Sequence, residues 1–311
     1  MAMTGPSLLE PSDPAAVAAE LGRSGAAHPE IVAACASSGG LLLFQGHPVV
    51  LAVQRDPVIA TTDVFVGLVD PSVLAARDQL VDLLDALFER YPGADRVFVR
   101  SPAGATVAAP PWLRLLMRYL AKPTGPAGHQ EAAGTAEAGA EEAGTRPADE
   151  TTTPFVQQLL AKTLGIGYAA AGYPVPLETA LDYIRDTYPC FGPDAAARAL
   201  VAFDGGDAVG HVTWVPDSED DVTAAPYWEL VDLETVDKGR GHGARLLAAL
   251  ERRAAAAGAT LLGNVVVEPG SRGWAALYES LRRSGWSPTF DIWMCPRGHR
   301  ARDGTSDHER R

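Results

Sequence analysis

A glycine-rich bend constrains the fold of this chain more than any other part of its sequence. Residues 236–253 read VDKGRGHGARLLAALERR, in which three glycines fall within five positions and two basic residues stand among them. Glycine is favoured where backbone must turn tightly or approach a ligand. Leu246, Leu247, Leu250 and Ala254 follow at helical spacing, so a helix is predicted directly after the bend. The free backbone N–H groups at the start of such a helix predict an anion site.

A segment without large side chains divides the chain. Residues 122–154 contain no aromatic or large aliphatic residue and are dominated by small, acidic and proline residues. Such a composition buries too little apolar surface to offset the entropy lost on ordering. We therefore expect a disordered linker at 122–153, between a lobe at 1–121 and a lobe at 154–299, with a disordered tail at 300–311.

The two lobes repeat a similar order of elements. In the second lobe, two amphipathic helices within 155–188 precede three strands, the glycine-rich bend, a helix, a strand, a further helix and a terminal strand. The first lobe is predicted to hold three strands, a helix at 72–91, a strand and a second helix at 111–120. The stretch after its third strand contains no glycine. We predict an α/β (α+β) fold class in which each lobe is a mixed, mostly antiparallel sheet flanked by helices, and in which the first lobe lacks the anion site.

Composition and charge exclude several classes of partner. The chain has 311 residues and a formal net charge of -13, whereas nucleic-acid binding needs a basic face that neutralises many phosphates. No run approaches the roughly 18 uncharged apolar residues of a membrane span. Residues 1–20 carry acids where a signal peptide would have a basic start. We expect a cytoplasmic protein with no nucleic-acid and no membrane partner.

The cysteines indicate neither a disulfide scaffold nor a metal site. The chain has three cysteines, an odd number, and they lack the paired spacing of metal ligands, which fits a reducing compartment. Cys295 and His299 could supply two ligands, but a zinc site needs more. No metal is expected.

The bend resembles the acyl-CoA site of the GNAT superfamily of N-acyltransferases. The signature of that family is Arg or Gln, two residues, Gly, one residue, and then Gly or Ala, set between a strand and a helix. In this chain residues 238–243 read KGRGHG, and Lys238 takes the place of the Arg or Gln. A Walker phosphate loop is excluded because the Gly-Lys-Ser/Thr ending is missing, and a Rossmann fingerprint is excluded by the spacing.

The resemblance extends past the next strand. The family commonly carries NxxAxxLYxxxGF there, and residues 271–286 read SRGWAALYESLRRSGW, which keeps the Leu-Tyr pair at Tyr278 and the final Gly285 and Trp286. Ser271 replaces the usual asparagine, and the final glycine comes three residues late. The resemblance implies two GNAT-like lobes, of which the first is degenerate.

The resemblance implies an acyl-CoA or acetyl-CoA co-substrate and direct attack of an amine on its thioester in a ternary complex. The pyrophosphate would rest on the bend at the helix N-terminus, and the preceding strand would bond the pantetheine arm. His242 is expected to point to solvent and to contribute its backbone amide. The implied coenzyme-binding residues are Leu233, Glu234, Thr235, Val236, Lys238, Gly239, Arg240, Gly241, His242, Gly243 and Ala244.

The attacking amine must lose a proton, so a general base is needed. Glu229 is expected on one face of its strand, with Asp232 and Glu234 on the opposite face, because side chains alternate along a strand. His211 lies on the preceding strand, and an unperturbed imidazole titrates near roughly 6.5, which suits proton removal near neutral pH. His211 and Glu229 are equal candidates for the base.

The resemblance also implies an acid and a class of acceptor. A tyrosine at the place of Tyr278 protonates the departing CoA thiolate in the family. The acceptor is expected to be a small-molecule amine, such as an amino sugar or a natural product. The outline looks closer to the N-acyltransferases of glycopeptide-antibiotic biosynthesis, chiefly through residues 28–50, 210–214 and 227–233. The alternative is a non-catalytic acyl-CoA-binding sensor or partner module, which the departures at Lys238 and Ser271 would favour.

Overall fold

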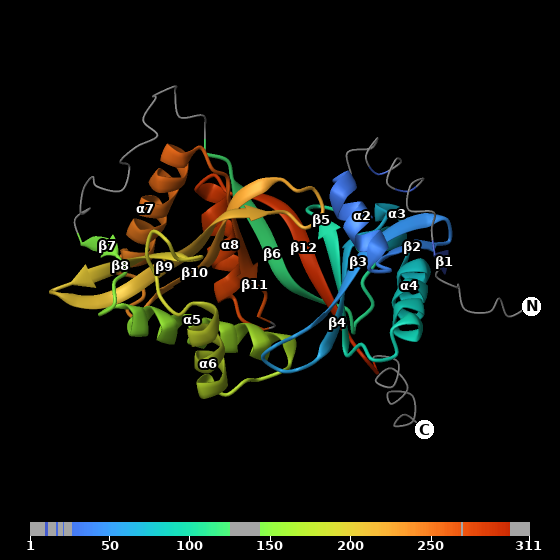
Figure 1. Cartoon of the computed structure of the whole chain (residues 1–311), viewed down its shortest axis with the longest axis horizontal. Coiled ribbons are helices and arrows are strands. Elements are labelled where there is room, and N and C mark those ends of the chain that lie inside the picture. The colour runs from blue at the N-terminus through green and yellow to red at the C-terminus, as the bar shows by residue number, and fades with distance from the viewer. Residues whose placement is uncertain are drawn as a thin grey trace, which may run out of the picture. The chain divides into compact units, whose positions relative to one another are not determined.

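The computed structural model of the chain describes residues 10–11, 17, 21, 27–124, 144–268 and 270–298, and it divides into two compact units (Figure 1). The predicted tail at 300–311 and residues 125–143 of the predicted linker lie outside the described residues. The first unit is formed by Met1–Arg118, Asp221–Ala224 and Pro288–Arg311, and the second by Tyr119–Asp220 and Ala225–Ser287.

The first unit is built on a mixed sheet. Its strands follow the order β1-β2-β3-β4-β5-β12 and are antiparallel, except for the parallel pair β4 and β5. The strands are β1 (Glu10–Pro11), β2 (Leu41–Phe44), β3 (His47–Arg55), β4 (Thr62–Leu68), β5 (Arg96–Pro102) and β12 (Ser287–Pro296). The helices are α2 (Pro29–Ser37), α3 (Pro71–Ala75) and α4 (Arg77–Arg90).

The helix predicted at 72–91 forms in two pieces, α3 and α4. The backbone of Ala76 is extended, with φ −101° and ψ 107°, and it interrupts the helix. Asp70 caps α3 by accepting a hydrogen bond from the backbone N–H of Ser72 at 2.8 Å. The apolar stripe of the predicted helix is confirmed, because its leucines are fully buried in the core of this unit; they are Leu80, Leu83, Leu84 and Leu87.

The helix predicted at 111–120 is wrong, because the segment forms strand β6 (Arg114–Lys122). Only Leu116 and Leu120 of this strand are buried, and a spacing of four residues fits one face of a helix as well as one face of a strand. Pro110 and Pro111 also precede it, and they favour an extended entry to the strand.

The observed units depart from the boundaries expected from the sequence, and two of the departures involve strands. Strand β12 was assigned to the second lobe, but Phe290–Pro296 pairs antiparallel with Arg96–Pro102 of β5 in the first unit. At the end of the predicted linker, Thr145–Pro147 forms strand β7, which pairs with β8 (Arg198–Asp204). Both differences come from backbone pairing between distant segments, which composition does not encode.

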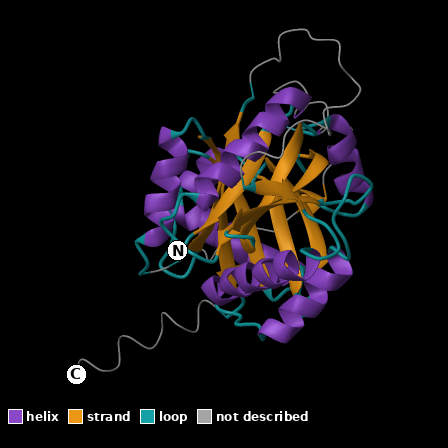
Figure 2. Cartoon of the chain, turned by 90° about the vertical axis from the view of Figure 1, so that its left-hand side faces the viewer, coloured by secondary structure: helices purple, strands orange, loops and turns teal. Residues whose placement is uncertain are grey.

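The second unit places helices on both faces of its sheet (Figure 2). Its strands follow the order β6-β11-β10-β9-β8-β7, and only β10 and β11 are paired in parallel among the strand pairs described in detail. The remaining strands are β9 (Asp207–Glu219), β10 (Pro226–Thr235) and β11 (Leu261–Val266). The helices are α5 (Thr153–Ala171), α6 (Leu177–Thr187), α7 (His242–Ala257) and α8 (Gly273–Arg283).

Alternation along β8 separates two hydrophobic cores in this unit. Leu200 packs in a cluster with Leu246 and Leu250 of α7, whereas Val201 packs in a cluster with Leu160 of α5 and Ile184 of α6. One face of the sheet is therefore covered by α7 and α8, and the other by α5 and α6. The expected mixed, mostly antiparallel sheet flanked by helices is confirmed.

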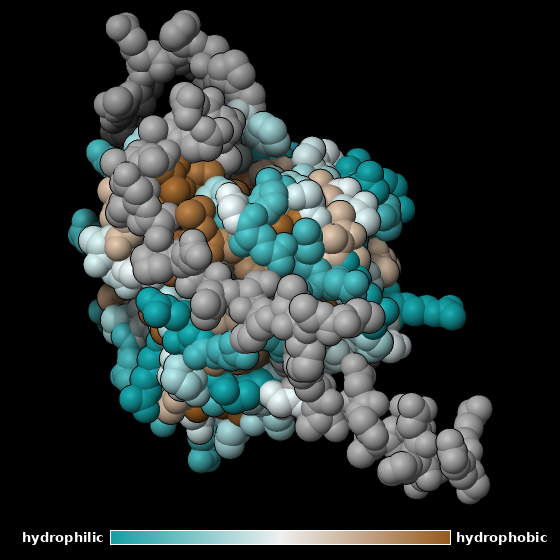
Figure 3. Space-filling view, turned by 90° about the vertical axis from the view of Figure 1, so that its right-hand side faces the viewer, coloured by the Kyte–Doolittle hydropathy of each residue, from teal (hydrophilic) through white to brown (hydrophobic). Residues whose placement is uncertain are grey.

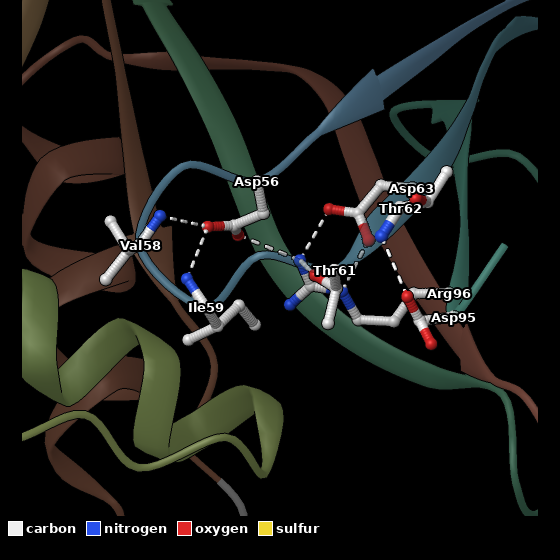
Figure 4. A network of polar contacts seen from close by, with 8 residues as sticks. All are labelled: Asp56, Val58, Ile59, Thr61, Thr62, Asp63, Asp95 and Arg96. Atoms are coloured by element: carbon white, nitrogen blue, oxygen red, sulfur yellow. Dashed lines mark hydrogen bonds and ion pairs between the residues drawn. The ribbon is translucent and has the colours of Figure 1, made fainter. Parts of the chain in front are cut away.

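A buried ionic network holds the β3–β4 loop of the first unit (Figure 4). Arg96 on β5 is 3% exposed, and its Nε donates to Oδ1 of Asp63 at 2.7 Å. Its Nη2 donates to Oδ2 of Asp56 and to Oγ1 of Thr61, both at 2.9 Å. Burial acts to lower the pKa of Arg96, but the hydrogen bonds that Arg96 donates to Asp63 and Asp56 outweigh it and raise that pKa.

Among the coloured residues in the view of Figure 3, hydrophilic residues predominate and hydrophobic residues appear in smaller groups. Among the described residues, every helix is too short or too polar to cross a lipid bilayer.

Candidate active site

The parallel ladder between β10 and β11 ends inside the second unit. The two strands are paired at Trp228 with Leu261, at Glu229 with Leu262 and at Leu230 with Gly263. Strand β10 then continues to Thr235 and β11 to Val266, and within these described strands they form no further pairs. On the other side of β10, pairing with β9 continues as far as Thr235 and Gly210. The backbone of β10 beyond Leu230 is therefore open on its β11 side.

A β-bulge lies at the point where the ladder ends. Leu230 pairs with Trp214 and Asp232 pairs with Thr213, so Val231 is an extra residue in β10. Leu230 packs on the α7 and α8 side of the sheet, whereas Val231 packs on the α5 and α6 side.

The bulge overturns the expected division of the carboxylates. Strict alternation of side chains along β10 predicts Asp232 and Glu234 on the face opposite to Glu229. Asp232 and Glu234 instead pair with Thr213 and His211 of β9, and Glu229 pairs with Val215, which packs against α5 and α6. The extra residue shifts the alternation by one position, so all three carboxylates follow one face of the sheet.

The glycine-rich bend has the conformation that its sequence predicts. Gly239 and Gly241 have φ values of +83° and +80°, which other residues adopt only with strain, and Gly241 is the N-cap of α7. A Cβ at Gly243 would lie 3.2 Å from Cδ2 of Leu233. Strand, turn and helix N-terminus therefore come together as predicted. Positive φ, rather than lack of space, favours glycine at Gly239 and Gly241, because a Cβ there would meet nothing within 4 Å.

The basic side chains of the bend are held by carboxylates. Nζ of Lys238 lies 2.8 Å from Oε1 of Glu234, and Nη1 of Arg240 lies 3.4 Å from Oδ2 of Asp204. Nζ of Lys162, on α5, lies 3.7 Å from the same oxygen of Glu234. Lys162 and Asp204 could not be predicted as neighbours of the bend, because both are distant from it along the chain.

His242 does not point to solvent, which corrects the expectation from the sequence. Its side chain is buried, its Nδ1 contacts a guanidinium nitrogen of Arg245, and its Nε2 lies 3.8 Å from Oδ2 of Asp204. The imidazole therefore supports the first turn of α7 from inside the fold.

His211 is enclosed by protein. Its side chain is 0% exposed, its Nδ1 lies 2.9 Å from Oγ1 of Thr213, and its Nε2 lies 3.2 Å from Oδ2 of Asp232. Both ring nitrogens thus face protein groups. Because the side chain is fully buried, a bound amine cannot reach the ring to give it a proton.

Glu229 is partly exposed on the α5 and α6 face, next to an aromatic group. Burial is the main cause that raises the pKa of Tyr188 to about 12, and the negative charge of Glu229 is the second. Tyr188 stacks on Phe191, with ring centroids 6.4 Å apart. Tyr188 therefore stays neutral, and Glu229 is the less enclosed of the two candidate bases.

Tyr278 lies on α8 and packs on the other face of the sheet. It is 9% exposed and belongs to the cluster that contains Leu246, Leu250 and Trp286. The structure thus brings His211 and Glu229 to one face and Tyr278 to the other, and the opening beyond Leu230 and Gly263 lies between these two faces.

Cys295, one of two possible ligands noted in the sequence, is buried, and burial raises its thiol pKa to about 12. His299 lies outside the described residues.

The open ladder, the glycine-rich bend and the helix N-terminus match a known family. Residues 168–282 match the family model described as the acetyltransferase (GNAT) family. The matched segment contains β10, the bend, α7, β11 and nearly all of α8. The second unit therefore contains a segment that is similar to the GNAT acetyltransferases. No curated protein matches the chain.

Solved structures resemble the chain over most of its length. The GCN5-related N-acetyltransferase from Sphaerobacter thermophilus gives a TM-score of 0.50 at 14% identity, covering 93% of this chain and 95% of that chain. The GCN5-related N-acetyltransferase from Kribbella flavida gives 0.40 at 14% identity, with coverage of 94% and 98%. A putative acetyltransferase from the GNAT family from Novosphingobium aromaticivorans DSM 12444 gives 0.38 at 18% identity, with coverage of 78% and 88%. The first of these likenesses shows a shared GNAT fold and nothing about substrates.

Proposed function

We propose that the protein is an N-acyltransferase that transfers an acyl group from acyl-CoA or acetyl-CoA to the amine of a small molecule. The observation that carries this proposal is the end of the β10–β11 ladder at Leu230 and Gly263, directly before the glycine-rich bend. A linear ligand arm can bond the open edge of β10, while a pyrophosphate accepts N–H bonds at the start of α7.

The residues of the bend fit a bulky anion. Gly239, Gly241 and Gly243 leave the backbone of the bend uncovered, and the first turn of α7 has N–H groups without intrahelical partners. Lys238 and Arg240 add positive charge next to them. The remaining proposed coenzyme contacts are the backbone of residues 233–236 and the first turn at His242 and Ala244.

The co-substrate supplies a thioester, in which a C–S bond breaks as the C–N bond to the acceptor forms. Glu229 takes the proton of the amine, directly or through a water molecule, because its carboxylate is less enclosed than His211. Tyr278 donates a proton to the departing thiolate across the opening between the strands.

The acceptor is a cationic amine in its resting form. Glu229 is a partly exposed carboxylate on the face of β10 that α5 and α6 cover, and the chain is acidic overall, so a positively charged acceptor is favoured by charge. An amino sugar or another amine-bearing natural product, as in antibiotic biosynthesis, meets this description. We further propose that the first unit is a degenerate GNAT-like lobe and that the protein acts in the cytoplasm.

Two measurements test this function. Calorimetric titration with acetyl-CoA and longer acyl-CoA thioesters measures binding, and thiol release in the presence of a panel of amines, with product masses, measures transfer. Gly241→Glu places a carboxylate in the bend and should abolish binding. Gly258→Glu, at the opposite end of α7 and also at positive φ, is the matched control and should bind normally. Failure of the wild-type protein to bind any acyl-CoA overturns the proposal.

A second candidate is an acyl-CoA-binding sensor without catalysis. It is favoured by the tie between Lys238 and Glu234, which occupies the cation at the Arg or Gln place of the signature. This candidate predicts binding with slow thioester cleavage that no amine accelerates and that Tyr278→Phe leaves unchanged.

A further inference from the structure

His211 and Asp232 form a buried polar pair in the second unit. His211 is 0% exposed and the side chain of Asp232 is 8% exposed, and Nε2 of the ring lies 3.2 Å from Oδ2 of the carboxylate. Thr213 completes the group, since its Oγ1 lies 2.9 Å from Nδ1 of the ring. Neither Nε2 of His211 nor Oδ2 of Asp232 has a hydrogen-bond partner among the described residues, so their contact is an electrostatic approach rather than a hydrogen bond. Burying such a pair costs desolvation free energy, so its presence is weak support for stability alone and calls for another role.

The contact crosses the strand ladder diagonally at the bulge. Asp232 is directly opposite Thr213, and His211 is opposite Glu234, so the imidazole reaches back along β9 to the carboxylate. Asp232 is also the first residue after the extra residue Val231. The pair therefore ties β10 to β9 directly after the point where β10 leaves β11.

A close backbone approach beyond the pair keeps β10 on β9. A Cβ at Gly210 would lie 2.7 Å from Cγ2 of Thr235 and 2.8 Å from the carbonyl oxygen of Glu234. Only glycine at this position lets the end of β10 come so near to β9. The pair and Gly210 act on the same stretch of β10, one at each end.

We propose that Asp232 and His211 are positioning residues for the acyl donor. Their buried contact fixes the bulge at Val231 and holds β10 beyond Leu230 on the β9 side, so that the opening toward β11 keeps the width that a pantetheine arm needs. This inference rests on the proposed function. It gives the buried imidazole a role in donor binding in place of proton transfer.

Two ligands separate this role from general stability. CoA carries the pantetheine arm, whereas adenosine 3′,5′-bisphosphate lacks that arm and keeps one of the two phosphates of the pyrophosphate that the bend would hold. In Asp232→Ala the affinity for CoA should fall about tenfold or more, while the affinity for the bisphosphate stays within about twofold of wild type. Asp232→Asn keeps a polar partner for the ring and should recover most of the CoA affinity.

A double variant removes the cost of an unpaired buried group. Asp232→Leu combined with His211→Phe replaces the pair by apolar side chains, which can preserve stability. This variant should therefore remain folded in thermal denaturation. Because the diagonal polar contact is lost, it should still show the selective loss of CoA affinity. If Asp232→Ala does not fold, the double variant still provides the measurement of CoA affinity.

The outcomes are distinct. CoA affinity within about twofold of wild type in both Asp232→Ala and the double variant overturns the inference, and so does a parallel loss for both ligands in a folded variant. If the wild-type protein binds neither CoA nor any acyl-CoA, the proposed function itself is overturned, and the positioning role is overturned with it. Gly241→Glu should lose both ligands and so marks the pattern expected for damage to the bend.

Discussion

Lys238, in the glycine-rich bend, donates a hydrogen bond from Nζ to Oε1 of Glu234, near the end of β10, at 2.8 Å. Lys238 is 72% exposed, whereas Glu234 is 16% exposed and also faces Lys162 of α5. The most exposed cation of the bend is thus tethered at the open end of β10. A pyrophosphate bound to the bend would compete with Glu234 for this ammonium.

Replacing Lys238 should weaken donor binding with little effect on the chemical step. In Lys238→Met we expect KM for acyl-CoA to rise about tenfold, because one charge-assisted hydrogen bond to phosphate is lost, while kcat changes little. Steady-state kinetics at several salt concentrations measure this. Lys238→Arg keeps the charge and should stay close to wild type. An unchanged KM in Lys238→Met would remove this lysine from the donor site.

Glu229 should carry the base function. In Glu229→Gln we expect kcat to fall about 10²–10⁴-fold and the acid limb of the pH profile to disappear, because the amide cannot take a proton. Binding of acyl-CoA, followed by calorimetry, should be retained. His211→Gln serves as the comparison, since its defect should appear in donor affinity with the acid limb preserved. If His211→Gln instead removes the acid limb, the assignment of the base is reversed.

Tyr278 should act on the leaving group. Tyr278→Phe conserves volume in the cluster with Leu246 and Leu250, so thermal stability should change little, while kcat falls about 10²-fold through loss of the acid. Trp286→Phe, in the same cluster, is the packing control: it should lower the denaturation midpoint more than kcat. A Tyr278→Phe enzyme of normal kcat would assign the tyrosine to packing alone.

The elements around the bend were predictable because their signals are local. Positive φ values at Gly239 and Gly241 and a helix starting at His242 follow from neighbouring residues, and the structure has them. The faces of β10 were not predictable. Strict alternation put Asp232 opposite to Glu229, and one extra residue at Val231 reverses that result.

Long-range pairing limited the rest of the prediction. Nothing near β12 in the sequence indicates that it completes the sheet of the first unit, because its partner β5 is about two hundred residues away in the chain. The burial of His211 and His242 likewise depends on neighbours from other elements. Residue type alone therefore suggested two accessible imidazoles where the structure encloses both.

Asp149 should make stability depend on pH at the start of α5. Hydrogen bonds from the hydroxyls of Thr151 and Thr152 and from their backbone N–H groups lower its pKa to about 2. A lowered pKa in the folded state means that the contribution is complete above the unfolded value of about 3.9 and is lost as the pH falls through about 2. The melting temperature of Asp149→Ala should therefore lie below that of wild type at neutral pH, and the gap should close toward pH 2. Glu150→Ala, the neighbouring carboxylate, should show no such pH-dependent gap.

Arg96 should be the most sensitive position of the first unit. In Arg96→Met the carboxylate of Asp63, which is 3% exposed, loses both of its guanidinium hydrogen bonds, and Asp56 loses the contact that anchors the β3–β4 loop. An uncompensated buried charge costs about 3–5 kcal/mol of unfolding free energy, which denaturant titration measures. Arg96→Lys should rescue little, because an ammonium cannot replace the planar fork. Arg77→Met, on the exposed start of α4, should change the free energy by less than about 0.5 kcal/mol, and an equal effect of the two Met variants would contradict the network's role.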